Sequence, residues 1–302
     1  MNYLELLFPD FSLIVLGYLL CRFTPINRSV WQAVEQLVYY LLFPVLLFHS
    51  IVKSPIQWGE ASQLLAAGLL SGLAGIALTY SLPYWPVLGA KLDKRAYAAS
   101  AQVAFRFNSF IALALASRLA GPEGLLYVSV LIGVSVPLCN VAAVWPMARG
   151  SGQNFLGQLV RNPLIISTVC ALIFNALGLQ IPALMETSVS RLGGASIALG
   201  LMAAGAGLKL GALASNKLLA SELLLIRHLL QPLLAFAMVR AFGLQGAQAI
   251  ALMAFAGLPT ASSCYVLAVR MGYDGAFVAS MVSLSTLFGV LSLPFALSLI
   301  GL

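Results

Sequence analysis

Two short stretches carry the polar residues of this chain that could bind a ligand, and both lie inside long apolar runs. The first stretch, AFRFNSF, begins at position 104, and the second, AFAGLPTASSC, begins at position 254. Amide and hydroxyl groups can donate hydrogen bonds to an anion, and an arginine can attract it. We therefore predict an anion-binding site at these residues: Arg106, Asn108, Ser109, Pro259, Thr260, Ser262 and Ser263.

The second stretch contains residues that interrupt a helix in the middle of an apolar run. Pro259 has no backbone N–H and its ring clashes with the preceding turn, so carbonyl groups there lose their helical partners. Inside a bilayer, such backbone is tolerated only where protein covers it or where it lines a wet cavity. A broken membrane helix with hydroxyl groups beside the break is typical of a transporter's binding site. A single break is equally compatible with a structural kink.

Arg106 and Arg227 are predicted to lie near the middle of the bilayer. Arg106 comes eleven residues after Arg95, and Arg227 comes ten residues after Lys217, which places each about 15 Å inward along a helix. A central arginine costs at least about 2.5–3.5 kcal/mol, so it faces a partner or a wet cavity. Each arginine has two interpretations: it attracts an anionic substrate, or it makes a structural hydrogen bond. For Arg106, the structural bond would be to carbonyls that the helix break frees. Snorkelling is a further alternative for Arg227, and we expect His228 to be a packing residue with satisfied hydrogen bonds.

The composition predicts an all-α polytopic membrane protein. The chain is 61% hydrophobic and 8% charged, whereas soluble globular chains have about 25% charged residues. Apolar runs of about 18 residues or more recur along nearly the whole length. We predict ten membrane spans, at residues 4–21, 31–52, 61–81, 96–118, 123–147, 162–179, 189–208, 218–240, 246–269 and 275–300.

The distribution of lysine and arginine predicts the orientation of these spans. The joints after the odd-numbered spans carry ten cations, and the joints on the opposite side carry four. Because cytoplasmic loops are richer in Lys and Arg, the ten-cation side should be cytoplasmic. Both termini should then lie outside the cytoplasm, with the protein in the cell inner (cytoplasmic) membrane. The net charge of +7 is mostly this topology signal, and nothing suggests a nucleic-acid partner.

The two polar stretches also indicate an internal duplication. Ala104-Phe105 recurs as Ala254-Phe255, and GPEG at 121–124 recurs as GYDG at 272–275. This common offset of about 150 residues divides the chain in two. We predict two five-helix repeats at 1–148 and 162–302, joined by a short cytoplasmic loop at 149–161. Because five is odd, the second repeat enters the membrane inverted, and the broken spans four and nine become equivalent.

The remaining residues argue against other classes of function. All nine acidic residues lie near span ends or in joints, so no intramembrane carboxylate is evident for coupling transport to a cation. No cysteine or histidine spacing suggests a metal, and no motif suggests a nucleotide or a catalytic nucleophile. We therefore predict no enzyme activity and no cofactor. Small residues within spans are predicted to be helix-packing positions: Gly68, Ser71, Gly72, Gly75, Gly205 and Gly207.

The chain resembles the auxin efflux carrier family, which includes bacterial permeases and the plant PIN-type exporters. The resemblance runs through FPDFSLIVLGYLLCR, VYYLLFPVLLFHSI, RFNSFIALALA, RNPLIISTVCALIFNALGLQIPALM and LPTASS, in that order along the chain. It implies ten helices, with spans 1, 2, 6 and 7 as a scaffold and spans 3–5 and 8–10 as a mobile transport part. It also implies elevator-type movement, a homodimer formed through the scaffold, and carboxylate substrates.

One position departs from the family pattern. The first crossover of the family usually carries a proline a few residues after the asparagine, but Ile111 to Ala114 contain none. We therefore expect span four to be less fully unwound than span nine. The loop at 149–161 is short compared with the long regulatory loop of plant exporters, which favours a bacterial permease.

These observations predict a secondary transporter of a small organic anion, auxin-like or a dicarboxylate, with Arg227 as electrostatic support for the site. Without an evident coupling carboxylate, the membrane potential alone could drive export of a monovalent anion. Two alternatives stay open: a Na⁺- or H⁺-coupled organic-acid symporter of the same fold, and a non-transporting membrane sensor that uses the same pocket. The sequence leaves the identity of the transported acid undetermined.

Overall fold

The computed structural model describes residues 3–53, 58–86, 88–148, 163–208, 216–261 and 263–302, and these residues form helices and turns without a β-strand. Within these ranges, six helices are long and apolar enough to cross a membrane: Arg28–Lys53, Ser62–Tyr84, Ile111–Met147, Ala183–Ala206, Lys217–Ala241 and Gly275–Ser298. Large apolar side chains are exposed on several of them, including Leu291 at 71%. Such a surface suits lipid rather than water. The protein is therefore a multi-pass membrane protein.

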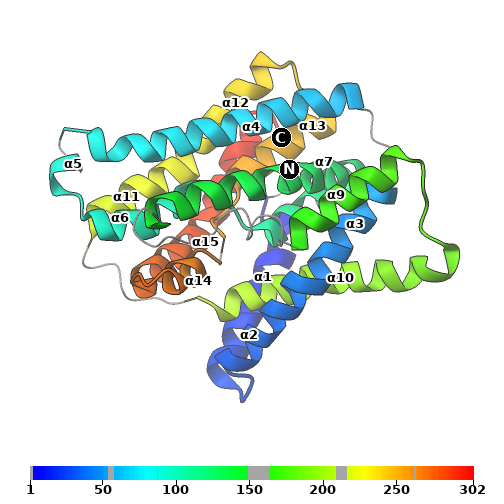
Figure 1. The fold of residues 1–302 in the computed structure, drawn as a ribbon, viewed down its shortest axis with the longest axis horizontal. Helices are drawn as coiled ribbons and strands as arrows, with labels where there is room; N and C mark the ends of the chain where they lie inside the picture. Colours follow the sequence, from blue (N-terminus) through cyan, green and yellow to red (C-terminus); the bar gives the residue numbers. More distant parts are fainter. Residues whose placement is uncertain (1–2, 54–57, 87, 149–162, 209–215, 262) are drawn as a thin grey trace.

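The helices follow one another with short connections (Figure 1). In chain order they are α1 (Tyr3–Phe23), α2 (Arg28–Leu37), η1 (Val38–Leu42), α3 (Phe43–Lys53), α4 (Trp58–Ser81), η2 (Leu82–Tyr84), α5 (Leu88–Lys91), α6 (Lys94–Ser100), η3 (Ala101–Ala104), α7 (Ser109–Ala148), α9 (Pro163–Ala176), α10 (Ala183–Ala206), α11 (Lys217–Leu225), η5 (Ile226–Leu230), α12 (Gln231–Ala241), α13 (Gly246–Gly257), α14 (Ser263–Arg270) and α15 (Gly275–Ser298). The predicted loop at 149–161 lies outside the described residues.

Two of the long helices contain a π-helical turn, and each turn precedes a proline. The turn η1 comes just before Pro44, and the turn η5 comes just before Pro232. Proline lacks the N–H that a helix needs and its ring clashes with the carbonyl four residues earlier. A wider turn accommodates both defects without ending the helix. As a result, α2, η1 and α3 form one continuous helix, and α11, η5 and α12 form another.

The helix α7 is 40 residues long and bends about a third of the way along, at Ala120 and Gly121. At the bend Gly121 has a φ of 56°, a left-handed conformation that glycine adopts at little steric cost. The bend falls in the joint expected between residues 118 and 123. In the related GYDG motif, Gly272 has a φ of 78°, and Asp274 caps α15 by accepting the N–H of Ala276 at 2.8 Å. Both copies of the duplicated motif therefore form a turn before a long helix segment.

Contacts between the helices divide them into two groups (Figure 1). The first helix group consists of α1, α2, α3, α9 and α10, and the second helix group consists of α4, α6, α11, α12, α13, α14 and α15. The helix α7 packs against both groups, and the largest buried apolar cluster joins residues of both. Each group buries its own smaller apolar clusters as well.

The first helix group is held together by close backbone approach. A Cβ atom built at Gly205 of α10 would lie 1.8 Å from the carbonyl oxygen of Ile14, and one built at Gly17 of α1 would lie 1.9 Å from that of Met202. The close-packing role predicted for Gly205 is confirmed. Gly207, by contrast, is the residue that ends α10.

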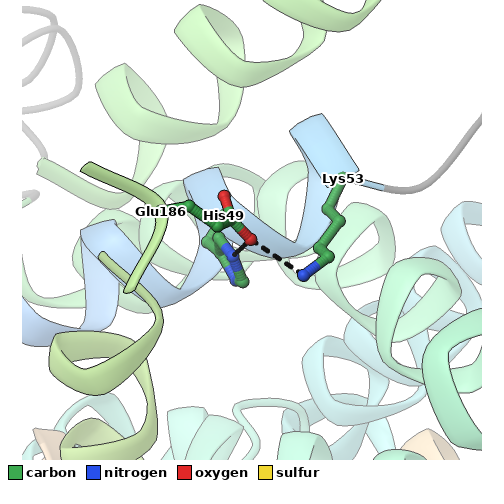
Figure 2. Close-up of polar contacts among 3 residues, drawn as sticks. All are labelled: His49, Lys53 and Glu186. Atoms are coloured by element: carbon green, nitrogen blue, oxygen red, sulfur yellow. Dashed lines mark hydrogen bonds and ion pairs between the residues drawn. The ribbon is translucent and has the colours of Figure 1, made fainter. Parts of the chain in front are cut away.

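A polar contact joins α3 to α10 in the same group. Figure 2 shows Glu186 of α10 facing His49 and Lys53 of α3. One carboxylate oxygen of Glu186 lies 3.0 Å from Nε2 of His49 and 2.8 Å from Nζ of Lys53. Because Lys53 is largely exposed, this contact orients the two helices and adds little stability.

Candidate functional site

The two predicted binding stretches are places where helices are interrupted, and the interruptions touch each other. The first break covers residues 105–108, between η3 and α7, and the second follows α13 at residues 258–261. The backbone N–H of Asn108 donates a hydrogen bond of 2.9 Å to the carbonyl oxygen of Pro259. Two stretches that are far apart in the sequence thus form one site.

The first break forms without a proline because Asn108 starts a new helix. Its side-chain Oδ1 accepts the N–H of Ile111 at 3.3 Å, and its carbonyl oxygen accepts the N–H of Ala112 at 3.1 Å. Asparagine is among the most favourable N-cap residues. We expected this break to be less fully unwound than the second, and that expectation is wrong. All four residues from 105 to 108 have left the helix, and Asn108 caps the helix that begins after them.

At the second break, Arg227 of η5 binds carbonyl groups that the end of α13 leaves without helical partners. Its Nε donates to the carbonyl of Leu258 at 2.7 Å, and its Nη2 donates to those of Phe255 and Ala256 at 3.4 and 3.3 Å. These carbonyls carry the partial negative charge of a helix C-terminus. The side chain is buried, with 2% of the residue exposed, so it does not snorkel. A structural hydrogen-bonding role for Arg227 is confirmed, and its attraction of substrate stays a prediction.

The neighbouring His228 joins the second break to α15. Its Nδ1 lies 2.8 Å from Oγ of Ser292, and its Nε2 lies 2.8 Å from Oγ of Ser285. The Ser292 hydroxyl donates to the carbonyl of Gly257 at 2.8 Å, so it must accept the Nδ1–H of His228. Ser285 then donates to Nε2 and accepts the N–H of Thr260 at 2.9 Å. With a neutral imidazole, these bonds satisfy both ring nitrogens of His228, and the expected satisfied packing role is confirmed.

A glutamine connects Arg106 to the helix after the second break. Nη1 of Arg106 donates to Oε1 of Gln102 at 2.9 Å, and Nε2 of Gln102 donates to the carbonyl of Cys264 at 3.1 Å. Gln102 is 1% exposed, so this link is buried. Carbonyls at the end of α13 are bound by Arg227, and a bond from Arg106 to freed carbonyls stays a prediction. The carbonyl of Phe105 in the same break accepts from the thiol of Cys139, with a separation of 3.6 Å.

The site offers hydrogen-bond donors and positive charge rather than ligands for a metal. Across the described ranges of the chain, no three His, Cys, Asp or Glu side chains gather closely enough to hold a metal ion. The helices α7 and α14 both begin at the breaks, and helix N-termini favour negative charge. The arrangement can therefore hold an anion by backbone N–H, amide and hydroxyl groups.

Comparison with known proteins identifies the family of this chain. A family model described as "Membrane transport protein" matches residues 146–297, which make up half of the chain. The chain belongs to this family. The resemblance to auxin efflux carriers is thereby confirmed. The chain is also similar to an uncharacterized transporter of Methanothermobacter thermautotrophicus, with 22% identity over 285 residues that cover 93% of each chain.

The structure of this transporter brings most of the predicted site residues together. Asn108, Pro259 and Thr260 lie buried at the contact between the breaks, with Thr260 fully inaccessible. Ser109 begins α7 and is half-buried, as is Arg106. Helix α14 begins at Ser263, and Ser262 lies outside the described residues.

Sequence reasoning missed three residues of the transporter that support these breaks: Gln102, Ser285 and Ser292. Each is a polar residue within an apolar run, which is the signal that could have found it. Ser285 and Ser292 are seven residues apart on α15, and this spacing places both on one face of a helix. Their partners come from other helices, so sequence spacing alone does not identify what they bind.

Proposed function

We propose that this membrane transporter is a secondary carrier of a small organic anion, auxin-like or a dicarboxylate. The observation that carries the proposal is the contact between the two breaks, where Asn108 meets Pro259. Amide, hydroxyl and backbone N–H groups gather there, and Arg106 lies in the first break. A carboxylate accepts hydrogen bonds from such donors and is favoured by the N-termini of α7 and α14.

The same proposal includes ten membrane crossings in two inverted five-helix repeats. The apolar segment Ile111–Met147 has 37 residues, far more than the roughly 20 that one crossing needs. Its bend at Gly121 supports two crossings instead of one. The matching positive φ at Gly272 supports a related turn in the second repeat. Paired breaks then lie at equivalent positions of the repeats, the arrangement of many secondary transporters.

The two helix groups suit elevator-type movement in this proposal. The first group corresponds to spans 1, 2, 6 and 7 and would be the scaffold, through which a homodimer would form. The second group, with both breaks, would carry the substrate across the membrane. We place the protein in the cell inner membrane with both termini outside the cytoplasm, as its Lys and Arg distribution predicts.

Export would be driven by the membrane potential. A potential of 100 mV supplies about 2.3 kcal/mol per elementary charge, which corresponds to a gradient of about fifty-fold. Coupling to Na⁺ or H⁺ would instead need a cation site, and all nine acidic residues lie near the ends of the predicted spans or in the joints.

Charge movement in proteoliposomes tests the proposal across a panel of organic acids. The variant Asn108→Asp keeps a good N-cap for α7 and places a negative charge where a carboxylate would bind. We expect it to fold and to lose at least tenfold in current. Asn27→Asp is the matched control, because Asn27 caps α2 through its side chain and is exposed. It should keep full current.

Other outcomes contradict the proposal in different ways. If Asn108→Asp carries the same current as the wild type, the substrate does not bind at the contact between the breaks. Flux that requires Na⁺ or a pH gradient at clamped potential would indicate a coupled symporter. Acid binding without current or tracer flux would indicate a membrane sensor.

A further inference from the structure

A small cavity with a few polar side chains in its wall lies near the two breaks, between the second helix group and α7. It has a volume of about 20 Å³, and its walls come from α4, α7, α13 and the π turn η5 with the start of α12. Phe105 from the first break and Phe255 beside the second both line it. A volume of roughly 10–15 Å³ already holds one water, so the cavity fits a water or one monatomic ion. Organic acids need sites of about 300 Å³ or more.

Four polar side chains line this cavity, and each belongs to a residue that is more than nine-tenths buried. They are Ser71 of α4, Ser135 of α7, Arg227 of η5 and Gln231 of α12. The Nε and Nη2 groups of Arg227 donate to carbonyls of the second break. Its Nη1 group, the Gln231 amide and the two hydroxyls make no hydrogen bond to another described residue. The cavity therefore presents several N–H and O–H donors that need an acceptor.

The charge of Arg227 decides which acceptor suits the cavity. The carbonyls at the end of α13 supply a helix-terminus charge of only about −0.5. No ion pair within the described ranges involves Arg227, and no Asp or Glu lines the cavity. A water would accept hydrogen bonds but would leave this buried charge partly uncompensated, whereas an anion satisfies both requirements. A cation is excluded by the guanidinium group.

We propose that this cavity binds one small monovalent anion of halide size, held by Arg227, Gln231, Ser71 and Ser135. The site is separate from the contact between Asn108 and Pro259, and it goes beyond the proposed transport of an organic acid. Because Phe105 and Phe107 of the first break and Phe255 and Ala256 at the end of α13 line the cavity, an anion bound here would hold the first break against the end of α13.

Thermal unfolding of the protein in detergent tests this proposal. Sodium chloride or bromide should raise Tm in a saturable way relative to sodium gluconate at the same ionic strength. The double variant Ser71→Ala/Ser135→Ala should weaken chloride affinity at least tenfold, because each of the two hydrogen bonds to a charged group contributes about tenfold or more. Ser129→Ala is the matched control, because Ser129 is a buried serine of α7 that bonds within its own helix, to the carbonyl of Leu125 at 2.7 Å.

A second variant displaces a side chain that lines the cavity. A Cβ atom at Gly75 of α4 would lie 1.5 Å from Nε2 of Gln231, so Gly75→Ala must displace the Gln231 amide. We expect Gly75→Ala to abolish the chloride-dependent rise in Tm, while Gly194→Ala, at a glycine of α10 whose added Cβ would meet nothing within 4 Å, should keep it.

Crystals grown with bromide locate the bound anion. An anomalous diffraction peak beside Arg227 would support the proposed site. Equal Tm in chloride and gluconate, with no anomalous peak in the cavity, would overturn the proposal in favour of bound water. A chloride effect that the serine variants leave unchanged would also overturn it, as a non-specific salt effect. These readouts measure binding, so their failure is distinct from a failure of organic-acid transport.

Discussion

At the scale of single residues, two neighbours in one π-helical turn stabilise the second break through different elements. Arg227 binds the carbonyls at the end of α13, and His228 binds two serines of α15. Adjacent residues of a regular α-helix point about 100° apart. The wider turn before Pro232 presents both to the same break. The N–H of Thr260 is already bonded to Ser285, so substrate binding would rely on the other donors.

The serines that orient His228 provide the first prediction. Ser285→Ala would leave the N–H of Thr260 and Nε2 of His228 without their partner, and we expect a loss of about 1–3 kcal/mol in unfolding free energy. Thr286→Val is the control on the same helix, because the Thr286 hydroxyl bonds only to the carbonyl of Val282 within α15. Thermal unfolding in detergent would show a clear drop for Ser285→Ala alone. An equal drop in both variants would contradict the network.

A second prediction concerns the charge of Arg106. Two unit charges about 12 Å apart at an effective dielectric constant of about 20 interact by about 1.4 kcal/mol, or tenfold in affinity. We therefore expect Arg106→Gln to raise the KM for an anionic substrate about tenfold, and Arg106→Lys to keep most of the wild-type value. Initial transport rates in proteoliposomes measure this difference. Equal KM values for the two variants would assign Arg106 a purely structural role through Gln102.

The two arginines show how far residue-scale prediction from sequence extends. Counting residues from the cationic joints predicts that Arg106 and Arg227 lie deep in the membrane, and it predicts that each needs a partner. It does not identify the partner, because the carbonyls that bind Arg227 belong to another helix. Arg227 binds freed carbonyls, and the same role for Arg106 stays a prediction.

At the scale of the elements, close contacts between helices depend on the absence of a side chain. Gly205→Ala would place a methyl group 1.8 Å from the backbone oxygen of Ile14, and neither backbone can yield without separating α1 from α10. We expect a destabilisation of about 3 kcal/mol, seen as a lower Tm in detergent. Gly194→Ala on the same helix meets nothing within 4 Å. It should match or exceed the wild-type Tm, since alanine favours a helix by up to about 1 kcal/mol over glycine. A similar drop in both variants would refute the close-approach argument.

Helices are the part of this fold that the sequence predicts best. Long apolar runs and Pro259 predict α4, α10, α15 and the second break, because burial in a bilayer and the missing N–H act locally. The first break has no such local marker. It depends on Asn108 capping α7 and on the bond from Asn108 to Pro259, a partner far away in the chain. Tertiary contacts of this kind are not encoded in hydropathy.

At the scale of the whole molecule, a polar contact bridges the two helix groups. Nη2 of Arg28, at the start of α2, donates to the hydroxyl of Tyr265 on α14, and the guanidinium carbon lies 5.7 Å from the centre of the Tyr265 ring. Arg28 also pairs with Glu35 of its own helix at 2.9 Å. The contact links the first group to the helix that follows the second break. Any movement of one group along the other must break it.

The variant Tyr265→Phe removes only the hydroxyl and provides the last prediction. A hydrogen bond to a charged group contributes about 1.5–3 kcal/mol, so its loss should lower the population of the present conformation about tenfold or more relative to one in which the groups have moved. Cys170 is exposed and is first replaced by serine, so that spin labels attach only at the chosen sites. The labels are placed at Val30 of α2 and Leu291 of α15, both of which are exposed. In Tyr265→Phe, the two labels should report a second distance between them. Tyr40→Phe, at an exposed tyrosine of the first group, should keep the wild-type distance distribution. If Tyr265→Phe and Tyr40→Phe give the same single distance, the Arg28–Tyr265 contact does not restrain movement between the groups.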